Sequence, residues 1–217
     1  MISFSQVTKH YPGGYEALKG VAFTVEAGEM VFVTGHSGAG KSTLLKLVAA
    51  IERPTAGSVI VNGQNVGAMK AGAIPYLRRN LGLVFQDQKL LFDRSVLENV
   101  LLPLQIAGHG HREAGKRGRA ALDKVGLLGR ERARPITLSG GEQQRLCIAR
   151  AIVARPSILI ADEPTASLDA SYAGEIMDIF RAFHQVGVTV LVATHDQAMI
   201  QRLKPRVIRL EHGALAA

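Results

Sequence analysis

The sequence predicts an α/β fold, and three kinds of stretch carry that prediction. Residues 31–47 indicate a buried strand, a glycine-rich loop and the first turns of a helix. Residues 157–163 and 187–196 are apolar runs that end in polar side chains, as parallel strands buried on both faces do. Residues 2–7 and 17–25 partly alternate apolar and polar side chains, which favours a small antiparallel sheet near the N-terminus.

The glycine-rich loop has the spacing of a phosphate-binding loop, Gly-x-x-x-x-Gly-Lys-Ser, at residues 35–42. Its glycines let backbone N–H groups face a phosphate, and the following helix adds about half a positive charge. In this motif Lys41 reaches the β- and γ-phosphates, and the Ser42 hydroxyl binds Mg²⁺. The motif predicts binding of a nucleoside triphosphate, but kinases, GTPases and ATPases all share it.

Composition narrows the class of protein. The 217 residues fit one domain, or one with a modest subdomain. No run approaches the roughly 18 apolar residues of a membrane span, and residues 1–4 open no signal peptide, so we expect a soluble, cytoplasmic chain. One cysteine, Cys147, excludes an internal disulfide. The net charge of +8 favours binding to an anionic partner, such as lipid headgroups or nucleic acid. The alternative is that this charge only keeps the protein soluble.

The remaining elements are expected in chain order. Residues 2–7 indicate an edge strand, and residues 17–25 a second strand. The basic stretch 108–119 reads as a solvated loop or helix start, followed by an amphipathic helix over 120–128. Further strands and helices are expected over these ranges: strands 58–61, 81–85 and 207–210, and helices 74–79, 140–154 and 170–185.

Residues 138–145, Leu-Ser-Gly-Gly-Glu-Gln-Gln-Arg, are the second strong motif. Ser139 followed by Glu142 forms a capping box at a helix start. Gly140 and Gly141 leave backbone N–H groups exposed at the positive end of that helix. The motif therefore predicts a second anion site.

Polar residues end three of the predicted strands. Asp162 and Glu163 close one strand at the edge where ligands collect in an open α/β sheet. Asp162 can hold Mg²⁺ there, and Glu163 can orient or deprotonate water. Gln86 and His195 follow two other strands, and His195 is placed to sense the γ-phosphate.

Together the motifs resemble those of the ATP-binding cassette (ABC) ATPases, in order and over nearly the whole chain. The resemblance rests on residues 35–42, Gln86, 138–145, 158–163, 167–169 and His195. It implies a single nucleotide-binding domain over residues 1–217. That domain would have a RecA-like P-loop core, a helical subdomain at about 88–155 and a small N-terminal antiparallel β subdomain.

The resemblance also implies roles for individual residues, with ATP and Mg²⁺ as ligands. Glu163 resembles the catalytic base, His195 the switch histidine, and Tyr11 the aromatic that stacks on adenine. The Mg²⁺ ligands would be Ser42, Gln86 and Asp162, and Gln86 would also meet the attacking water. The phosphates would lie on Gly35, Ser37, Gly38, Ala39, Gly40, Lys41, Ser42 and Thr43. A second copy's ATP would bind Ser139, Gly140, Gly141 and Glu142, with Asp169 in the loop facing that copy.

Further stretches are similar to the FtsE-like cell-division subgroup: residues 34–47, 51–54, 86–87, 121–128 and 186–191. This implies an ATPase on the cytoplasmic side of the inner membrane, at the division septum. Its partner would be an FtsX-like integral membrane protein, with the division ring a further candidate, and the complex would activate cell-wall hydrolases. Two stretches depart from the subgroup, Ala166-Ser167 in place of Gly-Asn and the basic residues 109–119.

Two other interpretations stay open. A lipoprotein-release or efflux ABC ATPase shares the chemistry and differs in its membrane partner. A soluble nucleic-acid ATPase would use the basic charge, but such proteins usually carry a second cassette or a coiled-coil insertion, so nucleic acid is not the expected partner. For the membrane partner we expect docking on residues 84–102, with Gln86 reporting to Leu90, Leu91 and Phe92.

Overall fold

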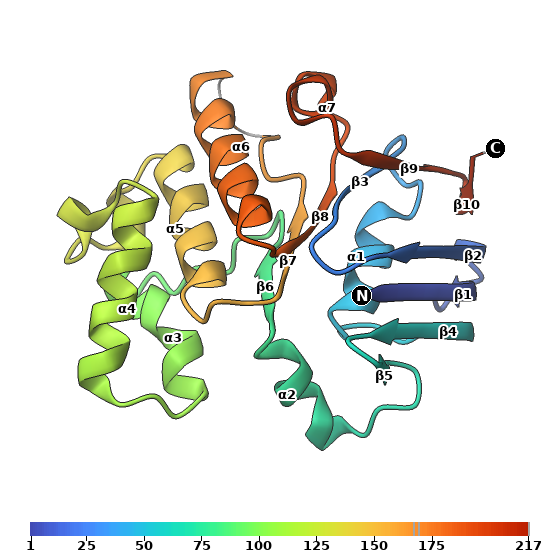
Figure 1. Ribbon diagram of the computed structural model, residues 1–217, viewed down its shortest axis with the longest axis horizontal. Helices are drawn as coiled ribbons and strands as arrows, with labels where there is room; N and C mark the ends of the chain where they lie inside the picture. Colours follow the sequence, from blue (N-terminus) through green and yellow to red (C-terminus); the bar gives the residue numbers. More distant parts are fainter. Residues whose placement is uncertain (167, 169, 217) are drawn as a thin grey trace.

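The computed structural model describes residues 1–166, 168 and 170–216, and it contains two sheets with helices around them (Figure 1). The larger sheet has the strand order β10-β9-β3-β8-β7-β6. Its strands are β3 (Met30–Thr34), β6 (Leu81–Val84), β7 (Ile158–Asp162), β8 (Thr189–Ala193), β9 (Arg206–Glu211) and β10 (Ala214–Leu215). Neighbours from β9 to β6 are parallel, and β10 joins β9 antiparallel. The α/β prediction is therefore confirmed.

The N-terminal sheet is antiparallel, as predicted, with the order β2-β1-β4-β5. It comprises β1 (Ile2–His10), β2 (Glu16–Val25), β4 (Ala56–Val61) and β5 (Gln64–Asn65). The prediction that β1 is an edge strand is wrong, because β1 pairs with β2 on one side and β4 on the other. Strand neighbours come from distant parts of the chain, so local alternation does not reveal them. Phe4 stacks on Phe23 with ring centroids 4.6 Å apart.

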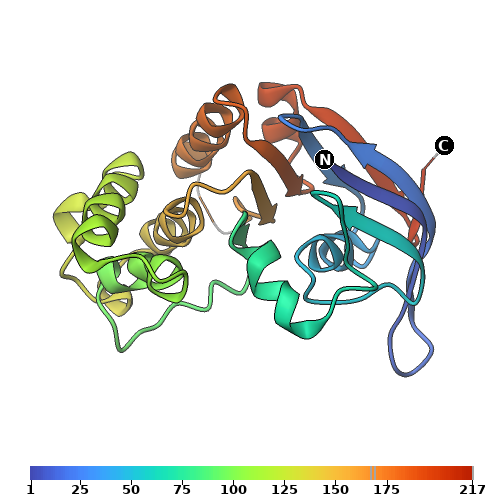
Figure 2. The same ribbon diagram turned by 60° about the horizontal axis from the view of Figure 1, so that its bottom comes forward.

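The helices lie around and between the sheets (Figures 1 and 2). They are α1 (Lys41–Val48), α2 (Ile74–Arg78), α3 (Val96–Ile106), α4 (His111–Lys124), α5 (Gly140–Ile152), α6 (Ala170–Gln185) and α7 (Gln197–Leu203). Short 3₁₀ turns lie at Ala71–Ala73, Leu128–Arg130 and Pro135–Thr137. Helices α3, α4 and α5 pack on one another. In the described part of the chain, no helix is long and apolar enough to span a membrane.

Helix α4 runs from His111 to Lys124, whereas the sequence predicts a loop or helix start up to residue 119 and an amphipathic helix over 120–128. Residues 111–119 of the basic stretch are therefore helical, as the helix-start alternative predicts. Gly115 and Gly118 lie inside this helix, although glycine weakens helix interiors. Gly118 is buried in the contact with α3, where a Cβ atom would lie 2.6 Å from Leu101 Cδ2. The close packing of the two helices thus outweighs the low helix propensity of glycine.

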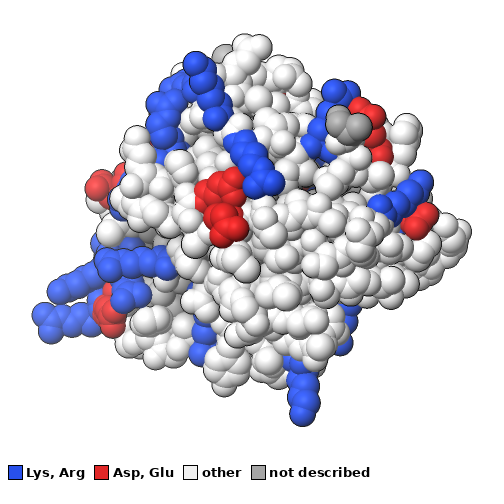
Figure 3. All heavy atoms as spheres, turned by 45° about the vertical axis from the view of Figure 1, so that its right-hand side comes forward, with Lys and Arg blue, Asp and Glu red and all other residues white. Residues whose placement is uncertain are grey.

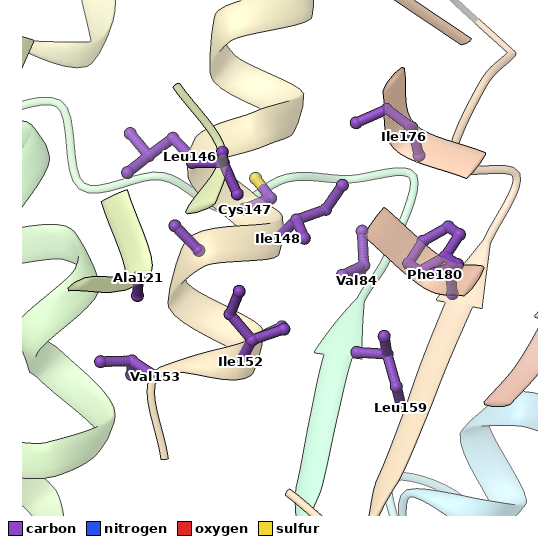
Figure 4. Close-up of a cluster of buried hydrophobic side chains, with 14 of the residues drawn as sticks. Val84, Ala121, Leu146, Cys147, Ile148, Ile152, Val153, Leu159, Ile176 and Phe180 are labelled. Atoms are coloured by element: carbon purple, nitrogen blue, oxygen red, sulfur yellow. The ribbon is translucent and has the colours of Figure 1, made fainter. Parts of the chain in front are cut away.

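A continuous apolar cluster connects the helices to the larger sheet. Figure 4 shows Ile148 and Ile152 of α5 on the side of Val84 of β6 and Phe180 of α6, while Leu146 points to the opposite side of α5. Each of these side chains is buried, and burial of one such side chain stabilises the fold by about 1.5–3 kcal/mol. Because α5 packs directly on the strands, its N-terminus is held in a fixed place relative to them.

Candidate nucleotide site

A cavity of about 480 Å³ lies over the loop that joins β3 to α1. Four segments that are far apart in the sequence meet around it, because β3, β8, β7 and β6 are neighbours and end at the same edge of the sheet. The lining residues are Tyr15, residues 35–43, Gln86, Glu163, Ala166 and His195. The structure thus brings together most of the residues that the sequence singled out.

Two glycines of the loop have no room for a side chain. At Gly35 a Cβ atom would lie 2.3 Å from the carbonyl oxygen of Leu210, and at Gly40 one would lie 2.5 Å from that of Ala17. Gly40 also has a φ of +103°, in a region that L-residues avoid. Close packing on the outer side of the loop therefore requires glycine and leaves its inner side facing the cavity.

Lys41 is buried beneath this loop. Its Nζ donates to the carbonyl oxygen of Gly35 at 2.8 Å and lies 3.5 Å from Glu163 Oε1. The ammonium group thus rests on loop carbonyls and one carboxylate, within reach of an anion in the cavity.

Glu163 sits between two basic groups. Its Oε1 lies 2.9 Å from His195 Nδ1 and 3.5 Å from Lys41 Nζ. The backbone of Glu163 has a φ of +48°, unusual for a residue other than glycine, and its N–H donates to the carbonyl oxygen of Ala193 at 2.8 Å. A strained conformation at a strand end aims this carboxylate into the cavity, and such strain is concentrated at functional sites.

Asp162 is buried at the end of β7, and its Oδ1 has no hydrogen-bond partner among the described residues. Burial is the main cause that raises the pKa of this carboxyl group, while a hydrogen bond with Ser42 opposes the rise. A buried carboxylate oxygen without a donor is costly. Asp162 and Ser42 are both hard oxygen ligands, so the residues present fit a Mg²⁺ ion. Gln86 lies nearby, in a second cavity that Ser42 and Asp162 also line.

The Ser-Gly-Gly-Glu motif does not line the cavity over the phosphate-binding loop. It forms the start of α5, and the predicted capping box is present. Ser139 N donates to Glu142 Oε2 at 2.8 Å, and Glu142 N donates to Ser139 Oγ at 3.3 Å. The bond from Ser139 N lowers the pKa of Glu142. Within one copy, the predicted second anion site is therefore separate from the first.

Two aromatic residues lie near the phosphate-binding loop. Tyr11 does not line the cavity; its hydroxyl is 3.4 Å from Thr43 Oγ1, and the Lys9 ammonium group lies 4.9 Å from its ring centroid. Tyr15 does line the cavity, and its hydroxyl donates to the Gly38 carbonyl oxygen at 2.9 Å. Sequence reasoning missed Tyr15, although a second aromatic in the same turn as Tyr11 was a signal for it.

The segment after Gln86 is attached to α5. Arg150 donates to the carbonyl oxygen of Lys89 at 2.9 Å, and Gln88 Nε2 donates to Gln144 Oε1 at 3.1 Å. Of the residues expected to face a membrane partner, Leu90 is buried and Phe92 is 49% exposed. Two other predicted positions, Ser167 and Asp169, lie outside the described residues.

Comparisons with known proteins agree with this geometry. The ABC transporter family matches residues 18–166. The chain is 52% identical to the cell division ATP-binding protein FtsE of Escherichia coli K12, over 99% of this chain and 97% of that protein. It is 43% identical to FtsE of Bacillus subtilis, over 99% of this chain and 94% of that protein.

A comparison with solved structures indicates the same family. A dimeric structure of the ATP-binding cassette MJ0796, in a post-hydrolysis state bound to ADP and Pi, superposes with a TM-score of 0.93 and 34% identity. The match covers 100% of this chain and 97% of that one. The chain therefore belongs to the ABC ATPases and, within them, to the FtsE group of cell-division ATP-binding proteins.

Proposed function

We propose that this ABC ATPase is the nucleotide-binding subunit of an inner-membrane cell-division complex and works with an FtsX-like membrane protein at the septum. One observation carries the catalytic part. Beside the phosphate-binding loop, the carboxylate of Glu163 contacts Lys41 and His195. The adjacent Asp162 is buried, and its Oδ1 has no hydrogen-bond partner among the described residues. This combination serves hydrolysis of a nucleoside triphosphate better than simple binding.

In the proposed reaction the backbone N–H groups of residues 35–43 hold the phosphates of ATP. Lys41 leaves the Gly35 carbonyl oxygen and binds phosphate oxygens. Glu163 orients a water molecule and takes one of its protons as the water oxygen attacks the γ-phosphorus, and the bond to the ADP oxygen breaks. His195, 2.9 Å from Glu163, holds that carboxylate in place. Fixed charges at the phosphates supply most of the rate.

Ser42, Asp162 and Gln86 are the proposed ligands of Mg²⁺. When bound, the ion neutralises charge on the β- and γ-phosphates. Tyr11 is the proposed contact to adenine.

The remaining anion site is proposed to act between two copies. Residues 139–142 lie outside the copy's own cavity, so they are free to bind the γ-phosphate of ATP held by a second copy. The dimeric MJ0796 relative supports this arrangement. In this proposal residues 1–217 form one nucleotide-binding domain with a helical subdomain at about 88–155.

Glu163→Gln tests the catalytic assignment. The variant should bind ATP with unchanged affinity and hydrolyse it at least about 100-fold more slowly, because a general base contributes roughly 10²–10⁴-fold. Glu26→Gln, at an exposed site, is the matched control and should keep the normal rate. Turnover of Glu163→Gln close to that of the control would show that another group is the base.

Two matched helix caps test the two-copy site. Ser139 caps α5 and Ser95 caps α3 with the same bonds, since Glu98 N donates to Ser95 Oγ at 3.2 Å. Replacing either serine with Ala should lower the free energy of unfolding by about 1 kcal/mol. Only Ser139→Ala, made in Glu163→Gln protein, should also weaken ATP-driven dimerisation in analytical ultracentrifugation. Equal dimerisation of the two variants would contradict the role of Ser139.

The membrane partner is tested by affinity capture from detergent-solubilised membranes, using Glu163→Gln protein with and without Mg-ATP. Capture of an FtsX-like protein is the expected result. Capture of a different permease would favour a lipoprotein-release or efflux complex. Leu91→Asp should abolish capture and leave ATP binding unchanged, since Leu91 lies in the proposed docking segment 84–102. Leu215→Asp, on β10, is the control and should leave capture unchanged.

A further inference from the structure

The nucleotide site does not explain the charge of residues 108–134. This stretch holds eight Lys and Arg residues against three acidic ones, so it carries five of the protein's eight net positive charges. It comprises α4 and the turn around Leu128–Arg130, which contact each other. Its charge is therefore concentrated on one pair of neighbouring elements.

Ion pairs neutralise only part of this charge. Glu113 pairs with Arg117 at 2.7 Å, and Glu131 pairs with Arg119 at 2.7 Å. Five exposed side chains make no ion pair with any described residue: Arg112, Lys116, Lys124, Arg132 and Arg134. We call these five residues the basic surface. Arg112 and Lys116 are four residues apart on α4, where like charges repel. An isolated solvated helix gains nothing from that arrangement, whereas an anionic partner removes the repulsion.

A hollow lies beside the basic surface. It has a volume of about 510 Å³ and is lined by Arg119 and residues 128–133. Three of these lining residues are arginines: Arg119, Arg130 and Arg132. Arg119 and Arg130 already bind Glu131 and the Thr137 carbonyl oxygen, which fixes their positions. Figure 3 shows Lys and Arg side chains projecting together from the left-hand edge of the molecule, with few acidic side chains among them. The hollow is large enough for a phosphate group.

We propose that the basic surface binds the headgroups of anionic lipids and holds this face of the protein against the membrane. The inference rests on the proposed place of the protein beneath a membrane partner. Residues 108–134 contain no Phe, Tyr or Trp, and proteins that bind single-stranded nucleic acid stack its bases on aromatic rings. Exposed apolar side chains border the basic surface instead, with Ile106 66% and Leu128 39% exposed. Basic groups beside apolar ones match the interface of a bilayer.

Vesicle binding tests this proposal directly. The full-length protein is sedimented with vesicles of phosphatidylcholine alone, or with about one third phosphatidylglycerol, at low salt and at physiological salt. We expect binding to the anionic vesicles only, weakening as salt screens the charges over about 8 Å. Each basic side chain near an anionic surface contributes about fivefold in partitioning. The variant Arg112→Gln/Lys116→Gln should therefore bind about 25-fold more weakly, and its ATPase rate should be normal.

A control pair of substitutions distinguishes an effect of the basic surface from an effect of the total charge of the protein. Lys19→Gln/Lys70→Gln removes the same charge at exposed positions on other elements and should bind vesicles within about twofold of the unmodified protein. Equal losses in both pairs, or no binding to anionic vesicles at all, would overturn the proposal. Tighter binding to duplex DNA than to these vesicles at the same salt would also overturn it. The vesicles contain no protein, so this test does not depend on capture of the membrane partner. Lipid binding and partner capture can therefore fail independently of each other.

Discussion

Replacing Asp162 with Asn removes a buried charge and keeps the shape of the side chain. Asp162 Oδ1 has no hydrogen-bond partner among the described residues, and burial raises the pKa of this carboxyl group. An unsatisfied buried charge costs more than an unsatisfied neutral amide, by about 1 kcal/mol or more. For a chain of this size, 1 kcal/mol corresponds to about 2–4 °C. We therefore expect Asp162→Asn to raise the Tm of the ligand-free protein by at least about 2 °C.

With Mg-ATP the sign of the effect should reverse. A ligand at 100 times its Kd adds about 2.7 kcal/mol to stability, which is roughly 5–10 °C here. Asp162→Asn should lose most of this gain, because a neutral amide binds Mg²⁺ less well than a carboxylate. Differential scanning fluorimetry, with Mg-ATP and with ATP plus EDTA, measures both effects. Asp178→Asn, at an exposed ion pair with Arg202, is the control. It should change little either in the Tm without ligand or in the Tm gain with Mg-ATP.

The pH dependence follows from the same carboxyl group. Its folded-state pKa is raised above the ordinary value of 3.8. Between these two values the folded protein keeps a proton that the unfolded chain has released, so the contribution of Asp162 to stability falls as pH rises through that window. Asp162→Asn should remove this part of the pH dependence. The reasoning is refuted if the variant keeps the full Mg²⁺-dependent gain, or if its ligand-free Tm falls.

Three further changes test other parts of the site. Gly40→Ala should destabilise the protein by about 1–3 kcal/mol in urea unfolding and abolish ATP binding, because a Cβ atom would lie 2.5 Å from the Ala17 carbonyl oxygen. At Gly72 a Cβ atom meets nothing within 4 Å, so Gly72→Ala should change neither the stability nor ATP binding. Arg150→Ala should lower stability by about 0.5–1.5 kcal/mol, because the carbonyl oxygens of Gln88 and Lys89 lose a donor. A normal urea midpoint would show that water replaces these bonds. Burial raises the pKa of the Cys147 thiol to about 11, so at pH 8 alkylation should be slow in the native protein and fast after unfolding; equal rates would mean that the thiol is accessible.

Local signals predicted the chemistry well. The phosphate-binding loop, the capping box at Ser139 and the acidic end of β7 are each specified by a few neighbouring residues, so they can be found in the sequence. Parallel strands that are buried on both faces are continuous apolar runs, and β7 and β8 were found in this way. The sequence left residues 108–119 open as a loop or a helix start, because the packing of Gly118 against α3 is seen only in the structure.

By itself, the sequence determined which residues can bind phosphate, cap α5 and supply carboxylates, because these properties depend on residue type and short spacing. Only the tertiary structure decided which of them meet. The neighbour relations of β3, β8, β7 and β6 bring Lys41, Glu163 and His195 into one cavity. Those neighbours, like the central place of β1, are set by burial of apolar surface between segments that are separated in the sequence, by about 160 residues in the case of β3 and β8. The same packing keeps Ser139 out of that cavity.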